Sequence, residues 1–147
     1  MPGVKSQSGL SKTDRNFAWK AMSRDQKMNE LVKEYRALPW KTDHLPDTGL
    51  NNRKCEILRA LDSDANSSEA SALLLDVLRE TAEFDLARVE AIQVVGLYID
   101  ASSPLCKALY QEVIRIFNDE GEDDMLRGWA ERYVENLEAT TVLRGHV

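Results

Sequence analysis

The sequence contains few of the residues on which disulfide frameworks, metal sites and catalytic sites depend. Its 147 residues include two cysteines, two histidines and four prolines. Cys55 and Cys106 lie in apolar surroundings without a CxxC motif, so we expect buried free thiols, with a disulfide as the alternative. His44 and His146 are too far apart in sequence to form a local ligand pair. Composition therefore gives no indication of a metal site or a disulfide-rich fold.

Long apolar runs and catalytic motifs are also absent. No stretch approaches 18 consecutive apolar residues, and the first residues lack the apolar core of a signal peptide. We therefore expect a cytoplasmic protein without membrane contact. The chain has no glycine-rich phosphate loop, GxSxG motif or HExxH motif. We accordingly expect no enzyme and no cofactor. A hydrophobic content of 43% with 30% charged residues is typical of a soluble globular domain.

Charge divides the chain into two unequal parts. Residues 1–41 carry nine basic and four acidic side chains, whereas residues 42–147 carry ten basic and 21 acidic ones. An acidic surface repels phosphate groups and can attract a basic protein surface. Nucleic acid is therefore not the expected partner.

The apolar residues recur with helical spacing, and no segment alternates as a strand would. Six helices are predicted, over 23–38, 50–61, 68–82, 84–99, 104–117 and 123–138. Ser23 with Gln26 forms a capping-box pattern, and Ser103 before Pro104 predicts the start of another helix. We expect a single domain over 16–140, between flexible tails at 1–15 and 141–147.

Two of these helices share a motif. Asp85-x-x-Arg88-x-x-Ala91 returns 39 residues later as Asp124-x-x-Arg127-x-x-Ala130. Such a spacing is expected of a stacked two-helix repeat. Arg53 marks the corresponding helix of the first pair.

On these residues the chain resembles the HEAT-like (armadillo-type) family of helical repeats, most clearly at 84–97 and 123–137. The resemblance implies an all-α fold, a right-handed superhelix of about three antiparallel helix pairs. It also implies that Asp85, Arg88, Asp124 and Arg127 bond between neighbouring repeats as scaffold.

The acidic run 119–124 could suggest calcium, but the twelfth position counted from Asp119 is Ala130 instead of the glutamate that an EF-hand requires. We expect these carboxylates to begin the last helix, whose N-terminal dipole favours negative charge. No metal is predicted.

The remaining candidate is a protein-binding surface on the second helix of each pair, because stacked helical arrays bind partners along such faces. Its candidate residues are Glu56, Glu90, Gln93, Trp129, Arg132, Glu135 and Asn136. The predicted function is a non-catalytic protein-binding module. Its most specific form is a bacterial immunity protein that neutralises a toxin with a basic cleft. The alternatives are an adaptor or regulatory scaffold and, less favoured, a HEAT-like nucleic-acid enzyme.

Overall fold

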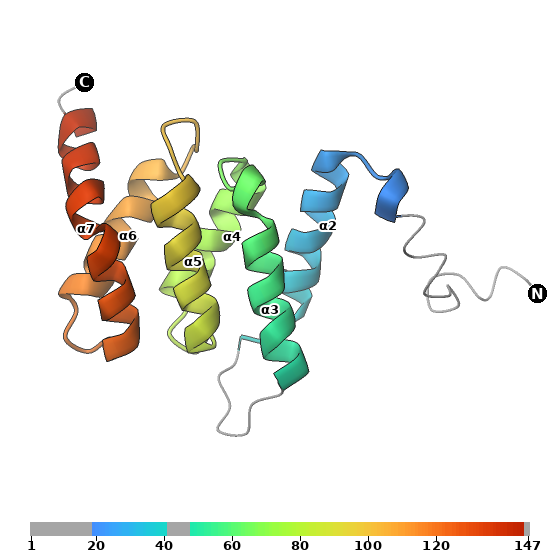
Figure 1. The fold of residues 1–147 in the computed structure, drawn as a ribbon, viewed down its shortest axis with the longest axis horizontal. Coiled ribbons are helices and arrows are strands. Elements are labelled where there is room, and N and C mark those ends of the chain that lie inside the picture. The colour runs from blue at the N-terminus through green and yellow to red at the C-terminus, as the bar shows by residue number, and fades with distance from the viewer. Residues whose placement is uncertain (1–18, 41–47, 146–147) are drawn as a thin grey trace, which may run out of the picture.

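The computed structural model describes residues 19–40 and 48–145, and within these ranges it contains helices and no strand, as predicted (Figure 1). The tail 1–15, His44 and His146 lie outside the described residues. The helices are α2 (Arg24–Ala37), α3 (Thr48–Ala60), the 3-10 turn η2 (Asp62–Asp64), α4 (Ser68–Arg79), α5 (Asp85–Tyr98), α6 (Cys106–Asn118) and α7 (Asp124–Gly145).

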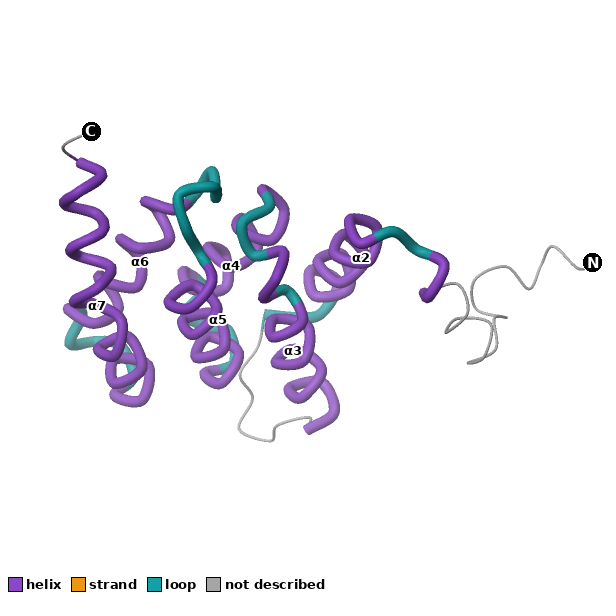
Figure 2. The backbone as a smooth tube through the Cα atoms, turned by 45° about the horizontal axis from the view of Figure 1, so that its top comes forward, coloured by secondary structure: helices purple, strands orange, loops and turns teal. Residues whose placement is uncertain are grey.

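The helices lie in two layers. Helix α4 packs against α2 and α6 in one layer, and α5 packs against α3 and α7 in the other. Each helix of the first layer also contacts the helix that follows it in sequence. Figures 1 and 2 show this side-by-side order from α2 and α3 to α6 and α7. The second layer, α3, α5 and α7, is the face on which the candidate surface was expected.

Helix α5 is the centre of the stack, in agreement with its nearly continuous apolar sequence. It contacts α3, α4, α6 and α7. Ala87, Ala91, Ile92 and Val95 are fully buried, because neighbouring helices cover several of its sides. None of the described helices could cross a bilayer, since each is too short or too polar.

The helix starts follow the predicted caps in one case and depart from them in another. Ser23 and Gln26 form the predicted capping box at α2. The start predicted at Ser103 and Pro104 is wrong, because α6 begins at Cys106. The Ser103 hydroxyl is buried and lies 2.6 Å from the Ser71 hydroxyl of α4. The same hydroxyl accepts a hydrogen bond from the Leu105 amide at 3.2 Å, so Ser103 joins the turn before α6 to α4.

The ends of α4 and α7 also differ from the ends that the apolar periodicity predicts. Helix α4 ends at Arg79, before the predicted end at 82, because the backbone of Glu80 is extended. The residues that follow turn back and bury Glu83. Helix α7 continues to Gly145, beyond the predicted end at 138. Met125, expected in its buried stripe, is exposed.

Candidate functional site

A repeated polar contact sets the register of the three helix pairs. Each second helix carries a cation that donates a hydrogen bond to a carbonyl oxygen in the last turn of the preceding helix or just beyond it. Lys54 Nζ donates to Pro39 O at 2.6 Å, Arg88 Nη2 to Leu78 O at 2.7 Å, and Arg127 Nε to Phe117 O at 3.1 Å. Carbonyl groups at a helix C-terminus lack intrahelical partners and attract positive charge.

Two of these cations also bind a carboxylate from the next pair. Lys54 Nζ lies 2.5 Å from Glu83 Oε1, and Arg88 makes a two-pronged contact with Glu122 at 2.9 and 2.8 Å. Glu83 stands in the turn between α4 and α5, and Glu122 in the turn between α6 and α7. Each glutamate precedes the cation of its own pair by five residues. The series Lys54, Arg88, Arg127 is called the cation ladder below.

The cation ladder corrects two expectations. Lys54, not Arg53, is the counterpart of Arg88 and Arg127, because Arg53 turns to Glu34 of α2 instead. The acids that the ladder cations bind in the next pair are Glu83 and Glu122. Among the described residues, neither Asp85 nor Asp124 has an ion-pair partner.

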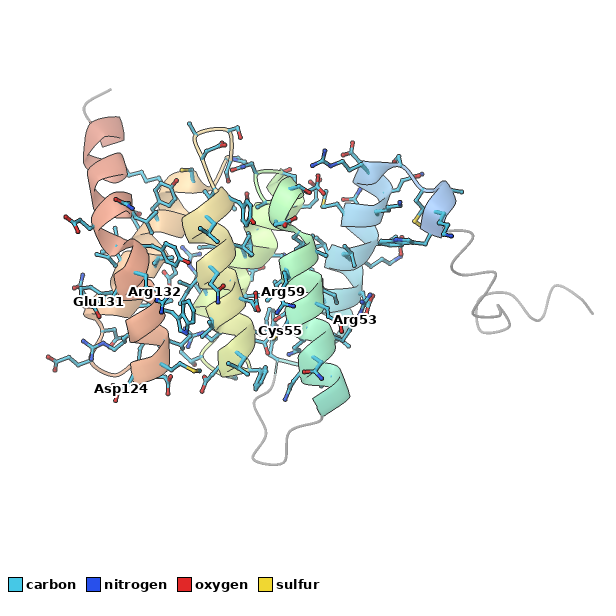
Figure 3. The ribbon with its side chains drawn as sticks, viewed as in Figure 1. Arg53, Cys55, Arg59, Asp124, Glu131 and Arg132 are labelled. Atoms are coloured by element: carbon cyan, nitrogen blue, oxygen red, sulfur yellow. The ribbon has the colours of Figure 1, made fainter. Side chains whose placement is uncertain are left out.

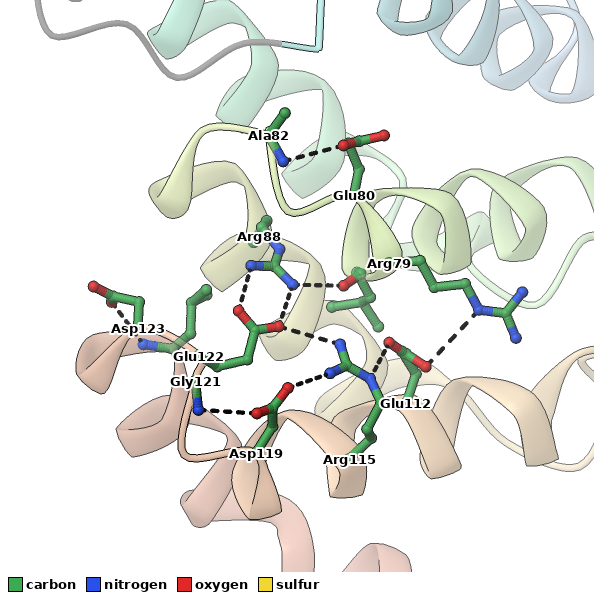
Figure 4. A network of polar contacts seen from close by, with 12 residues as sticks. Arg79, Glu80, Ala82, Arg88, Glu112, Arg115, Asp119, Gly121, Glu122 and Asp123 are labelled. Carbon is green, nitrogen blue, oxygen red and sulfur yellow. Dashed lines mark hydrogen bonds and ion pairs between the residues drawn. The ribbon is translucent and has the colours of Figure 1, made fainter.

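Glu122 belongs to a wider network of ion pairs (Figure 4). Arg115 Nη2 donates to Glu122 at 3.1 Å, while its Nε and Nη1 donate to Glu112 and Asp119. The hydrogen bond from Arg88 is the main reason that the pKa of Glu122 is lowered, against the opposing effect of burial. The acidic run thus includes a structural carboxylate.

The Lys54–Glu83 pair is completely buried. The Tyr35 hydroxyl donates to Glu83 Oε2 at 2.6 Å, and the Phe84 amide donates to Oε1 at 2.7 Å. Burial, followed by the hydrogen bond to Glu83, raises the pKa of Tyr35. Since each charged group has several partners, the cluster holds three helices together and leaves no reactive group open.

The ladder places the candidate surface residues in two rows. Two positions after each cation stand Glu56, Glu90 and Trp129, and five positions after stand Arg59, Gln93 and Arg132. Figure 3 shows Arg59 on α3 and Arg132 on α7, with α5 between these helices. Glu135 and Asn136, one turn further along α7, are exposed.

The acids of the first two pairs are not free. Arg59 Nη2 lies 2.5 Å from Glu90 Oε1, which joins α3 to α5. Arg53 Nη1 lies 3.4 Å from Glu56 Oε2. Gln93, Glu90 and Arg59 also line a small groove between α3 and α5, of about 120 Å³. This part of the face is mixed in charge.

The third pair replaces the ion pair by an aromatic site. The Trp129 ring is half-buried against the core, and the Arg132 guanidinium carbon lies 4.2 Å from its centre. Met125 and Gly128 complete a shallow, open hollow of about 330 Å³ beside them. A guanidinium stacked in this way keeps its edge N–H groups available for an acceptor.

The remaining polar candidates do not form a reactive cluster in the described ranges. Cys106 is buried and Cys55 half-buried, and both are free thiols. Burial raises the pKa of Cys55, which disfavours its thiolate. Among the residues whose side chains the structure describes, 19–40 and 49–137, no group of three potential metal ligands is close enough to hold an ion.

Comparison with family models, curated proteins and solved structures finds no match to this chain. The assignment of function therefore depends on the geometry of the second-layer face.

Proposed function

We propose that the chain is a non-catalytic protein-binding module, a HEAT-like right-handed superhelix of three helix pairs that binds a partner across α5 and α7. The repeated ladder contacts support the architecture. The distribution of exposed apolar side chains carries the functional proposal. Of the six large hydrophobic residues exposed in the described ranges, four belong to α5 or α7: Leu86, Leu97, Tyr98 and Met125.

Exposed apolar residues scattered singly need no explanation, but four of six on two neighbouring helices favour an interface there. Leu97 is 62% exposed and lies beside the groove with Gln93, and Met125 borders the Trp129 hollow. Extended faces of helical arrays are the surfaces with which such folds bind proteins. An adaptor or regulatory role fits a face of mixed charge and apolar character.

Toxin neutralisation is the second candidate. It depends on an acidic surface, and the arginines that pair with Glu56 and Glu90 reduce the charge available there. Glu131 and Glu135 favour it, because both are exposed and, among the described residues, neither has a salt-bridge partner. Figure 3 places Glu131 on the side of α7 away from α5, so a basic partner would approach the end of the stack.

The test starts from affinity purification with the full chain as bait, followed by binding measurements on the purified partner. Leu97→Asp and Met125→Asp should each weaken binding about tenfold or more, because each places a charge in an apolar contact. Lys107→Asp, at an exposed position of α6 in the other layer, is the matched control and should bind normally. Failure to recover any partner, or equal binding by all three variants, would contradict the proposal. Salt-sensitive binding of DNA by the chain would favour the nucleic-acid alternative instead.

A further inference from the structure

Arginines in this structure almost always have a carboxylate partner. Seven have a carboxylate oxygen within ion-pair distance: Arg24, Arg36, Arg53, Arg59, Arg79, Arg88 and Arg115. Among the arginines with described side chains, only Arg127 and Arg132 have none among the carboxylates described in residues 19–40 and 49–137. Arg127 donates to a backbone carbonyl, so Arg132 is the exception that needs an explanation.

Arg132 is held in place without being neutralised. Its side chain is exposed, and its guanidinium lies over the Trp129 ring. Stacking on an indole reduces the conformational freedom of the arginine before a ligand arrives. A guanidinium edge can then donate two parallel hydrogen bonds to a carboxylate.

Arg59, Gln93 and Arg132 each stand five positions after a cation of the ladder, and the first of them indicates the kind of group that this position binds. Arg59, the first member, takes the Glu90 carboxylate from the neighbouring helix pair. Gln93, the second member, is neutral. Arg132 is the third, and the described chain provides no acid in the corresponding place.

The residues around Arg132 further limit the chemical class of ligand that it can bind. Met125 lies in the same hollow and is exposed, so an apolar side chain can pack beside the guanidinium. Glu131 and Glu135 flank Arg132 in sequence and are exposed, which disfavours a dianionic phosphate or a nucleic-acid backbone. A single carboxylate next to an apolar group fits both features.

We propose that Arg132, stacked on Trp129, is the recognition site for a partner segment that places an aspartate or glutamate next to an aliphatic or aromatic side chain. This inference rests on the proposed function and names the chemistry of the partner at one part of the face. The carboxylate accepts hydrogen bonds from Arg132, and the apolar neighbour occupies the hollow beside Met125.

The experiment selects ligands for the full chain from a displayed library of random 12-residue peptides. The wild type, Arg132→Glu and the control Lys107→Glu are used as separate targets, each first shown to be folded by circular dichroism. Wild type and Lys107→Glu should select peptides with an acidic residue beside an apolar one. Arg132→Glu should bind these peptides at least about tenfold more weakly, because a charged hydrogen-bonded contact is lost. It should also select basic peptides in their place.

Peptides without acidic enrichment, or equal affinity for wild type and Arg132→Glu, would overturn the inference. Selection of no peptide would overturn it as well, because the site is proposed to recognise a linear segment. That last result would leave the proposed function standing if the cellular partner is still lost in Leu97→Asp. Failure of the two proposals is therefore distinguishable.

Discussion

The Arg88 guanidinium of α5 holds the Glu122 carboxylate of the third pair through two hydrogen bonds, Nη1 to Oε1 at 2.9 Å and Nη2 to Oε2 at 2.8 Å. Both side chains are almost fully buried. A third bond from Nη2 to Leu78 O ties the same arginine to the end of α4. One side chain therefore joins three parts of the stack.

Removal of either partner should cost far more than removal of a surface pair. Arg88→Ala leaves the Glu122 carboxylate buried and served only by Arg115, so we expect a loss of about 3–5 kcal/mol in the free energy of unfolding. The control is Arg36→Ala, since Arg36 and Asp76 form an exposed pair worth at most about 1 kcal/mol. Urea unfolding of the three proteins provides the comparison. Similar losses of unfolding free energy in both variants would show that the buried contact stabilises the fold no more than a surface ion pair does.

The same contact predicts a dependence of stability on pH. The folded-state pKa of Glu122 is lowered chiefly by Arg88, from an ordinary value of 4.5. Its stabilising contribution is therefore complete above that value and is lost as the pH falls through the lowered pKa. Glu122→Gln should reduce stability at pH 7 and flatten the decline below about pH 4.5, as measured by unfolding between pH 3 and 7. An unchanged acid profile in the variant would contradict this origin.

The sequence was sufficient for the helical class and for the middle part of each helix. Apolar spacing of 3.6 residues depends on local chemistry, so the cores of all six helices were found. Their ends were less accurate, because Ser103 has a partner that is distant in sequence and the backbone turns out of the helix at Glu80. Ser103 contacts Ser71, which no local cap rule includes.

Only part of the cation ladder could be predicted from the sequence. Arg53 was aligned with Arg88 by residue type, whereas side-chain direction on the helix selects Lys54. A usable signal existed, since Glu83 and Glu122 each precede an arginine by five residues. The Arg59–Glu90 pair could not be predicted in the same way, because it depends on the distance between two packed helices.

The buried Lys54–Glu83 pair should show strong coupling in a double-mutant cycle. Lys54→Met alone leaves a buried carboxylate without its cation and should cost about 3–5 kcal/mol. Lys54→Met with Glu83→Gln should cost less than the sum of the two single changes, because the double variant buries no charge while Tyr35 can still donate to the amide oxygen. Thermal and urea unfolding of the four proteins measure the coupling. Additive losses would mean that the two charges act independently.

Replacing two glycines on adjacent helices by alanine should change the free energy of unfolding in opposite directions. A Cβ at Gly96 of α5 would lie 2.4 Å from Cδ1 of the Tyr133 ring, whereas a Cβ at Gly128 of α7 would have no neighbour within 4 Å among the described atoms. Alanine gains up to about 1 kcal/mol over glycine in a helix interior. Gly128→Ala should therefore stabilise the protein by up to that amount. At Gly96 the forced separation of α5 and α7 outweighs the gain, so Gly96→Ala should destabilise by about 1–3 kcal/mol. Tyr133→Leu in the Gly96→Ala background should recover part of the loss, as measured by urea unfolding. If both alanine variants are stabilised, the ring of Tyr133 yields at little cost and α7 is not closely packed on α5.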